Sequence, residues 1–398
     1  MCVLNACGWL LLLCGGSSLA LAGGMGRDQA EEGWYGHGLM QLYGVYAHNA
    51  NIPSANQPRD VAALSPSMRL IGDGKLSASW SWEGHLLLGY VPAALQAMGT
   101  NVMRSRALER SADRGRAFAL VDRLNGQYMD ERWRVKLGRQ PVNLATNFFF
   151  MPNDFFAPFA AQSFYRAYKP GVDALRVDYA GDDLQQFTWL TVLGYQSRST
   201  TAGQMPASVT QMSARNSSHL LRASTQLEAF EVGVLAGRAG LDPVVGGNLQ
   251  TEFAEGIALR VEGNVRAIQS PTKMTSGAIS VGVQRYVNER LSLLGEYLFQ
   301  RMLNPWLPSS TMVKHDLATT LHYDWTPLLQ TELAVVVNGV DRSGMWMGYA
   351  TYSLNDESEM AIAITQPMGR SQLSSNPLIP SEFGAQPWTV SWDWRSYF

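Results

Sequence analysis

Charged side chains recur at alternate positions within two segments, residues 132–139 and 257–267, with mostly apolar residues between them. Alternation with a period of two places one set on one face of a β-strand and the other set on the opposite face. Guanidinium groups on such a face can pair with carboxylate or phosphate groups in a planar, bidentate geometry. The chemistry that these residues predict is therefore noncovalent recognition of polar or charged solutes. The charged positions of interest are Arg132, Arg134, Lys136, Arg260, Glu262 and Arg266.

Residues for covalent catalysis do not form a known motif. The sequence has no G-x-S-x-G, no H-E-x-x-H, no glycine-rich phosphate loop and no calcium loop. His322 and Asp316 would share one face of a strand, but six residues along a strand span about 20 Å. We therefore expect no enzymatic activity, no cofactor and no bound metal.

The last eleven residues, Trp388 to Phe398 (WTVSWDWRSYF), alternate between apolar and polar side chains up to Arg395. A lipid-facing surface does not tolerate the polar set, whereas a water-filled interior does. The segment resembles the C-terminal strand of bacterial outer-membrane β-barrels, whose terminal aromatic residue is read by the insertion machinery. Ser396 departs from that pattern, because such strands usually carry a bulky apolar residue at this position.

Composition also favours a barrel that lies in a membrane. Hydrophobic residues make up 46% of the chain and charged residues 16%, whereas about a quarter is charged in ordinary soluble domains. Beyond residue 22 no apolar run approaches the length of a membrane-spanning helix. Strands can cross a membrane only as a closed barrel, because every backbone group must be hydrogen-bonded. The net charge of -2 does not favour nucleic acid as a partner.

The first 22 residues predict a signal peptide. They contain no charged side chain, run apolar through residues 9–13, and end in Ala20-Leu21-Ala22 before Gly23. All three cysteines lie within this segment, so the mature chain would have no disulfide and no thiol ligand. Residues 23–398 are predicted to form a single transmembrane β-barrel domain.

Segments of about ten residues recur along the chain, separated alternately by short turns and long polar loops, as in outer-membrane barrels. The predicted turns are residues 83–84, 125–130, 181–183, 229, 254–256, 288–290, 325–327 and 355–358. The predicted loops are residues 47–69, 94–114, 141–169, 197–216, 241–243, 268–275, 303–312, 339–344 and 368–386. These connections predict an all-β, antiparallel barrel of about eighteen strands; sixteen is the alternative if residues 74–93 or 244–267 form one element.

The longest apolar loop lies between residues 136 and 179 and has six phenylalanines between Phe148 and Phe159. The preceding strand ends in Gly-Arg-Gln, and the next opens with Gly-Val-Asp-Ala. This region resembles alginate-export-type and other substrate-specific porin-like barrels, in which such a loop folds into the lumen. The resemblance implies that the pore constriction includes or adjoins Arg139, Gln140, Asn153 and Asp154.

The residues of this loop support the same interpretation independently. An infolded loop can bury its phenylalanines against the inner wall and present Asn153 and Asp154 to the passage. Opposite charges around a narrow passage sort solutes by size and charge. Inward ion pairs that only stiffen the barrel are the alternative interpretation. The opposing positively charged residues are Arg132, Arg134, Lys136, Arg176, Arg260 and Arg266.

These features lead to one functional hypothesis and two alternatives. The hypothesis is an outer-membrane porin or substrate-selective channel for passive diffusion of small polar or anionic solutes. The alternatives are a barrel sheath for a redox or secretion partner and an outer-membrane hydrolase. The expected partners are small solutes and outer-membrane lipid, including lipopolysaccharide; monomer and homotrimer both stay open. An arginine-rich segment is interpreted first as a solvated loop; the alternatives are that it binds lipopolysaccharide phosphates or lines the mouth of the pore. It contains Arg104, Arg106, Arg110, Arg114 and Arg116.

Overall fold

The computed structural model describes most of the chain after residue 32. The described ranges are residues 33–48, 59–97, 108–112, 115–159, 168–182, 184–197, 210–254, 256–269, 273–303, 312–370, 381–384 and 386–398. The predicted signal peptide, residues 1–22, lies outside these ranges, as do Arg104, Arg106 and Arg114. Within the described ranges, no helix is long and apolar enough to cross a membrane.

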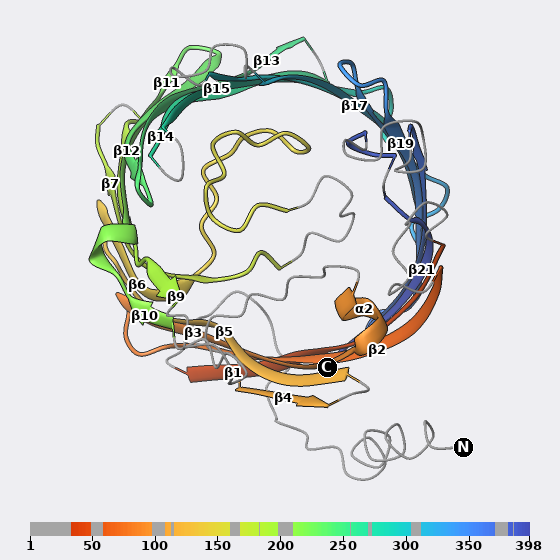
Figure 1. The fold of residues 1–398 in the computed structure, drawn as a ribbon. Helices are drawn as coiled ribbons and strands as arrows, with labels where there is room; N and C mark the ends of the chain where they lie inside the picture. Colours follow the sequence, from red (N-terminus) through yellow and green to blue (C-terminus); the bar gives the residue numbers. More distant parts are fainter. Residues whose placement is uncertain are drawn as a thin grey trace.

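Eighteen antiparallel strands form one closed ring around a lumen (Figure 1). They are β1 Gly33–His48, β2 Asp60–Lys75, β3 Trp80–Pro92, β5 Gly115–Met129, β6 Trp133–Gln140, β7 Val172–Ala180, β8 Gln186–Val192, β11 Ser218–Leu227, β12 Phe230–Ala239, β13 Asp242–Ala254, β14 Ile257–Ile268, β15 Met274–Tyr286, β16 Leu291–Leu303, β17 Met312–Asp324, β18 Leu329–Asn338, β19 Gly344–Asn355, β20 Ser358–Met368 and β21 Trp388–Tyr397. Short elements in the connections are α2 Ala93–Ala97, β4 Leu108–Ala112, β9 Tyr195–Ser197, β10 Thr210–Met212 and the 3-10 helix η1 Ala214–Asn216. The predicted fold class and the count of eighteen are confirmed.

Short turns and longer connections alternate along the ring, as predicted, but the first part of the chain differs from the prediction. The predicted turn at Glu83–Gly84 is wrong, because both residues lie inside β3; the turn comprises residues 76–79. The predicted loop 47–69 ends too late, since β2 already begins at Asp60. The turn predicted at 125–130 comes later, because β5 extends to Met129.

Pro66 explains why the start of β2 was misassigned. A proline between two serines is typical of a loop, and proline is excluded from most strand interiors. Here Pro66 pairs with Leu42 of β1, but β3 joins β2 only from Ser67 onward. Because β2 has one neighbouring strand at this point, the missing N–H of the proline is tolerated.

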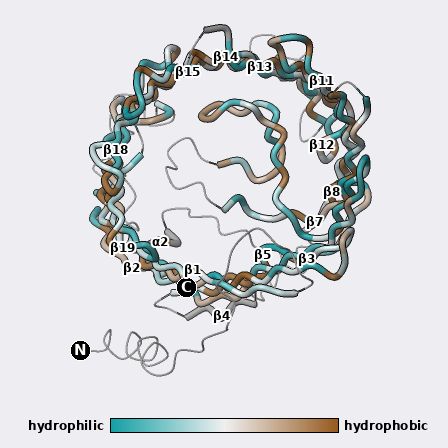
Figure 2. Tube along the Cα trace, turned by 180° about the vertical axis from the view of Figure 1, so that it is seen from behind, coloured by the Kyte–Doolittle hydropathy of each residue, from teal (hydrophilic) through white to brown (hydrophobic). Residues whose placement is uncertain are grey.

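The two faces of the strands are assigned as predicted. On β6 and β14, Leu137 and Val265 are 64% and 58% exposed on the outside, whereas Glu262 is 1% exposed on the inside. Figure 2 shows hydrophobic and hydrophilic residues alternating around the ring. An apolar outer surface of this extent is stable only against lipid or another apolar surface.

The barrel closes between its first and last strands. Residues Leu39 to His48 of β1 pair with Tyr397 to Trp388 of β21. Beyond this ladder, the backbone of Phe398 exchanges two hydrogen bonds with Gly38, at 2.7 and 3.0 Å. The Phe398 ring fills the place where a Cβ at Gly38 would be, 2.4 Å from the nearest ring carbon. Glycine at position 38 is therefore required for the terminal aromatic ring to lie flat on β1.

Candidate functional site

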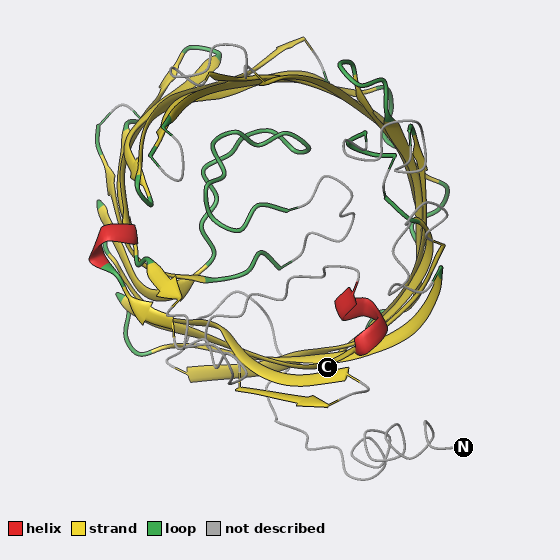
Figure 3. Ribbon diagram, in the orientation of Figure 1, coloured by secondary structure: helices red, strands yellow, loops and turns green. Residues whose placement is uncertain are grey.

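The connection between β6 and β7 folds into the lumen, as predicted, and its described part there contains neither helix nor strand (Figures 1 and 3). Its side chains Phe149, Phe150 and Phe156 are 5%, 7% and 9% exposed. They pack on two apolar patches of the inner wall, one on β16–β19 and one on β7, β8 and β11–β13. Because these patches would otherwise contact water, their burial drives the loop inward. Wall residues of the two patches include Leu298, Val336, Met345, Met347, Leu190, Leu220, Leu235 and Val244.

Two wall carboxylates bind the backbone of this loop. Glu296 on β16 accepts hydrogen bonds from the N–H groups of residues 148, 149 and 150 at 2.6, 2.7 and 2.9 Å. Glu262 on β14 accepts the N–H and the hydroxyl of Thr146 at 2.5 and 3.0 Å. Each glutamate is 1% exposed. Glu262 was predicted to line the pore, but its carboxylate is covered by the loop that it binds.

Asn153 and Asp154 are buried rather than presented to the passage, in contrast to the prediction. Asn153 is 0% exposed and donates a hydrogen bond to the carbonyl of Gly247 at 3.0 Å. Asp154 is 6% exposed and pairs with Lys169 of the same loop at 2.5 Å. A buried carboxylate needs such a partner, because an unpaired charge is costly to bury. Asn153 therefore attaches the loop to β13, and Asp154 stabilises the conformation of the loop itself.

The returning end of the loop is bound to the opposite part of the wall. The guanidinium carbon of Arg69 on β2 lies 4.3 Å from the centre of the Tyr168 ring. Arg69 also pairs with Asp122 of β5 at 2.6 Å, and Asp122 accepts the N–H of Gly171 at 3.3 Å. Arg69 is not among the predicted site residues, because it falls at the end of the predicted loop 47–69. The loop thus spans the lumen between two walls.

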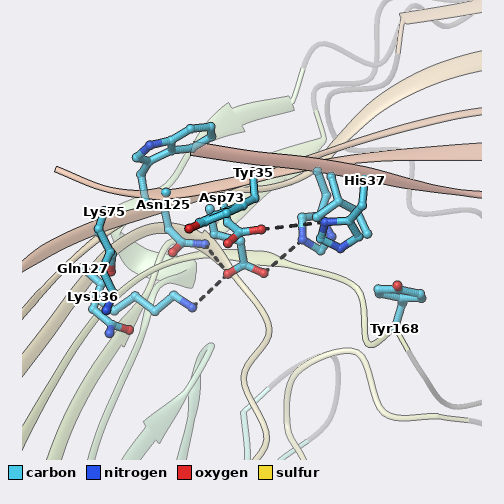
Figure 4. A pocket seen from close by; sticks show the side chains of 14 residues that line it. Tyr35, His37, Asp73, Lys75, Asn125, Gln127, Lys136 and Tyr168 are labelled. Atoms are coloured by element: carbon cyan, nitrogen blue, oxygen red, sulfur yellow. Dashed lines mark hydrogen bonds and ion pairs between the residues drawn. The ribbon is translucent and has the colours of Figure 1, made fainter. Parts of the chain in front are cut away.

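Lys136 faces the lumen, as predicted, and belongs to a cluster centred on Glu83 (Figure 4). The Glu83 carboxylate accepts hydrogen bonds or ion pairs from His85 at 3.1 Å, Arg123 at 2.8 Å and Lys136 at 3.1 Å. Asn125 donates a further bond at 3.2 Å. Glu83, His85, Asn125 and Lys136 line a cavity of about 470 Å³ on β1, β2, β3, β5 and β6. Glu83 is not among the predicted site residues, because it falls in the predicted turn at residues 83–84.

Replacing Glu83 by glutamine is expected to make the lumen more favourable to anions. The change leaves Arg123 and Lys136 without their shared counter-ion. We expect the anion-to-cation permeability ratio to rise roughly twofold, which corresponds to about 0.4 kcal/mol in ion partitioning. Reversal potentials in planar bilayers under a salt gradient measure this ratio. Glu357→Gln in the exposed turn between β19 and β20 is the charge-matched control; equal ratios in the two variants would contradict the assignment of Glu83 to the lumen.

Arg132 and Arg134 lie at the turn end of the barrel. The side chain of Arg132 is 56% exposed, and its guanidinium lies 3.2 Å from Asp182. Arg134 is also exposed. Asp130 holds this turn by accepting the N–H groups of Trp133 and Arg132 at 2.7 and 2.9 Å. These bonds stabilise the charged form and lower the pKa of the Asp130 carboxyl.

Three of the other predicted arginines are neutralised by nearby carboxylates. Such pairs agree with the alternative in which inward charges stiffen the wall. The adjoining Gln140 is 1% exposed and donates to the carbonyl of Ala174 at 3.0 Å. The ion pairs are Arg139–Asp173 at 3.6 Å, Arg176–Asp178 at 2.8 Å and Arg266–Asp242 at 2.5 Å.

Arg260 differs from these arginines. Within the described part of the chain its side chain makes no hydrogen bond or ion pair. It lines a cavity of about 320 Å³ with Phe148, His322 and Glu332. Of the predicted basic residues that lie away from the turn end, Arg260 is therefore the one whose guanidinium is left for a solute. The structure does not bring the ten predicted residues into one ring; it distributes them between loop anchors, wall ion pairs and separate cavities.

Solved structures with a similar fold were found by structural comparison, although no protein-family model and no curated protein matches the sequence. A BenF-like porin from Pseudomonas fluorescens Pf-5 has a TM-score of 0.58 at 8% identity, covering 92% of this chain and 98% of that chain. OccK11 (OpdR) from Pseudomonas aeruginosa has a TM-score of 0.57 at 10% identity, covering 93% and 98%. OccAB3 from Acinetobacter baumannii has a TM-score of 0.56 at 9% identity, covering 91% and 99%.

At such low identities the likeness establishes the fold alone. The chain has the fold of bacterial outer-membrane porins. Together with the apolar outer surface, this fold agrees with the predicted location in the outer membrane.

Proposed function

We propose that the protein is a substrate-selective channel for passive diffusion of small polar solutes, with a preference for anions. The observation that carries this proposal is the loop of residues 141–171, which is bound to β14 and β16 at one end and to β2 and β5 at the other. A passage narrowed by a fixed loop selects solutes by size, whereas an unobstructed barrel does not.

The preference for anions rests on Arg260. Most inward arginines already have a carboxylate partner. Because the partner's charge offsets theirs, these arginines contribute little positive electrostatic potential to the passage. A guanidinium without a partner can bind a carboxylate or phosphate through two parallel hydrogen bonds. The neighbouring Gln284, Thr320 and His322 offer further hydrogen bonds to such a solute.

A sheath around a redox or secretion partner is less well supported. Such a partner would have to fit through the lumen, which the infolded loop crosses. The buried carboxylates that bind the loop would have to lose their hydrogen bonds to let the partner in. Each hydrogen bond to a charged group contributes about 1.5–3 kcal/mol, so displacement is costly.

Arg260→Gln tests the proposed function. We expect the purified wild-type barrel to conduct ions in planar bilayers, and the variant to have a roughly threefold lower anion-to-cation permeability ratio, or about 0.7 kcal/mol in ion partitioning. Arg132→Gln at the turn end removes the same charge and is expected to change the ratio much less. An unchanged ratio in Arg260→Gln would contradict the anion preference. A wild-type protein without conductance would contradict the channel itself.

A further inference from the structure

Two cavities follow one another along β1–β5, and Tyr168 lines both. The cavity nearer the long-loop end has a volume of about 360 Å³ and is largely apolar, with Leu87 and Phe118 among its lining residues. The cavity nearer the turns has about 470 Å³ and contains Glu83 and Lys136. Figure 4 shows the Tyr168 ring across this second cavity from Lys136. A solute moving along this wall must therefore pass the Tyr168 ring.

The ring contacts three side chains of the wall. The guanidinium carbons of Arg69 and Arg123 lie 4.3 and 5.8 Å from its centre, and the His85 ring meets it edge-on at 6.0 Å. Cations over an aromatic face are attracted by the ring quadrupole. The pairing of Arg69 with Asp122 at 2.6 Å fixes the first of these cations. Tyr168 is thus a preorganised part of the loop and not a freely rotating side chain.

The chemistry changes across this ring. On the long-loop side, Arg69 is the charged residue of a cavity that is otherwise apolar or uncharged. On the turn side, the cavity is lined by several charged side chains, among them Glu83, Lys136 and Asp73. A solute with a flat apolar body can lie against Leu87 and Phe118 while its polar head lies near Arg69, whose charge is shared with Asp122. A compact, fully hydroxylated solute of the same charge gains nothing from the first cavity.

We infer that Tyr168 is the specificity-determining residue of the passage, which admits flat, apolar-bodied anions past its ring and retards bulky hydrophilic ones. This inference rests on the proposed channel function and adds to it the position of the size limit and the shape of the favoured solute. It depends on the place of one ring and not on the total charge of the lumen.

The test uses the full-length barrel in planar bilayers with two monovalent anion probes, benzenesulfonate and gluconate, each measured against chloride by reversal potential. We expect wild type to favour benzenesulfonate over gluconate. Tyr168→Ala should raise the relative permeability of gluconate at least threefold, Tyr168→Phe should leave it unchanged, and Tyr168→Trp should lower it. Phe187→Ala removes a ring that is 46% exposed on β8 and lines neither these cavities nor the Arg260 cavity, and it should have no such effect.

The outcomes separate this inference from the proposed function. If wild type does not conduct, the channel function fails. If wild type conducts and Tyr168→Ala and Tyr168→Trp both leave the probe ratio unchanged, the inference about Tyr168 is overturned. Equal effects of Tyr168→Ala and Phe187→Ala would also overturn it, because the position of the ring would then not matter. Heat-modifiable electrophoretic mobility verifies that each variant forms a closed barrel.

Discussion

Replacing both Glu262 and Glu296 by glutamine is expected to release the infolded loop and roughly double the single-channel conductance, since conduction depends on the width of the narrowest part of the passage. Glu296 accepts three backbone N–H groups and Glu262 accepts two groups of Thr146. A glutamine has one acceptor oxygen and no charge. Losing two charged acceptors weakens loop attachment by roughly 3–6 kcal/mol. We also expect noisier current, because the released segment moves in the passage.

Glu359→Gln is the control for this pair of substitutions. Glu359 is a partly buried carboxylate on the wall that pairs with Arg395 at 2.6 Å and not with the loop. If the double variant conducts like Glu359→Gln, with the same current noise, then the two glutamates do not hold the loop. The phenylalanine contacts would in that case be sufficient to fix it.

Replacing Gly38 by valine is expected to impair closure of the barrel. A Cβ at this position would lie 2.4 Å from the Phe398 ring, so the ring and the end of β21 must shift. Overpacking of this kind costs about 1–3 kcal/mol. We expect a lower refolding yield into detergent micelles and a lower urea midpoint of unfolding. Gly277→Val on β15, where nothing lies within 4 Å of an added Cβ, should be nearly neutral.

A double-mutant cycle with Phe398→Ala separates a steric effect from a change in β propensity. If valine acts by displacing the Phe398 ring, Gly38→Val should lower the free energy of unfolding only slightly in a protein that already carries Phe398→Ala. The effects of the two substitutions on the free energy of unfolding should then not be additive. Additive decreases in the free energy of unfolding would mean that Gly38 stabilises the barrel by something other than its contact with the Phe398 ring.

Most of the fold could be predicted because period-two alternation and turn chemistry are local properties of the sequence. Trp388 to Phe398 illustrates this: its faces, its place at the seam and its partner strand β1 all follow from alternation and closure. The prediction of β2 was wrong where a local signal, Pro66, conflicted with the pairing supplied by a neighbouring strand.

The site was harder to predict because the state of each charge depends on distant partners. Period-two alternation correctly placed Lys136 and Glu262 on the inner face. It could not show that Glu83, 53 residues from Lys136, neutralises it, or that Glu262 is covered by Thr146, 116 residues away. Asn153 and Asp154 were predicted to face the passage because they are polar. In the structure, Asn153 is hydrogen-bonded to the wall at Gly247, and Asp154 is paired with Lys169 of the loop.

The attachment of the loop also has a consequence for the order of assembly. Phe148 and Glu296 are 148 residues apart along the chain, and β14 and β16 both follow the loop in sequence. The loop therefore has no anchor on this side until the second half of the barrel has been added. Whichever end of the chain is inserted first, an intermediate that lacks either the loop or β14 and β16 also lacks the narrow passage. The constriction is therefore acquired late, as the wall that holds it is completed.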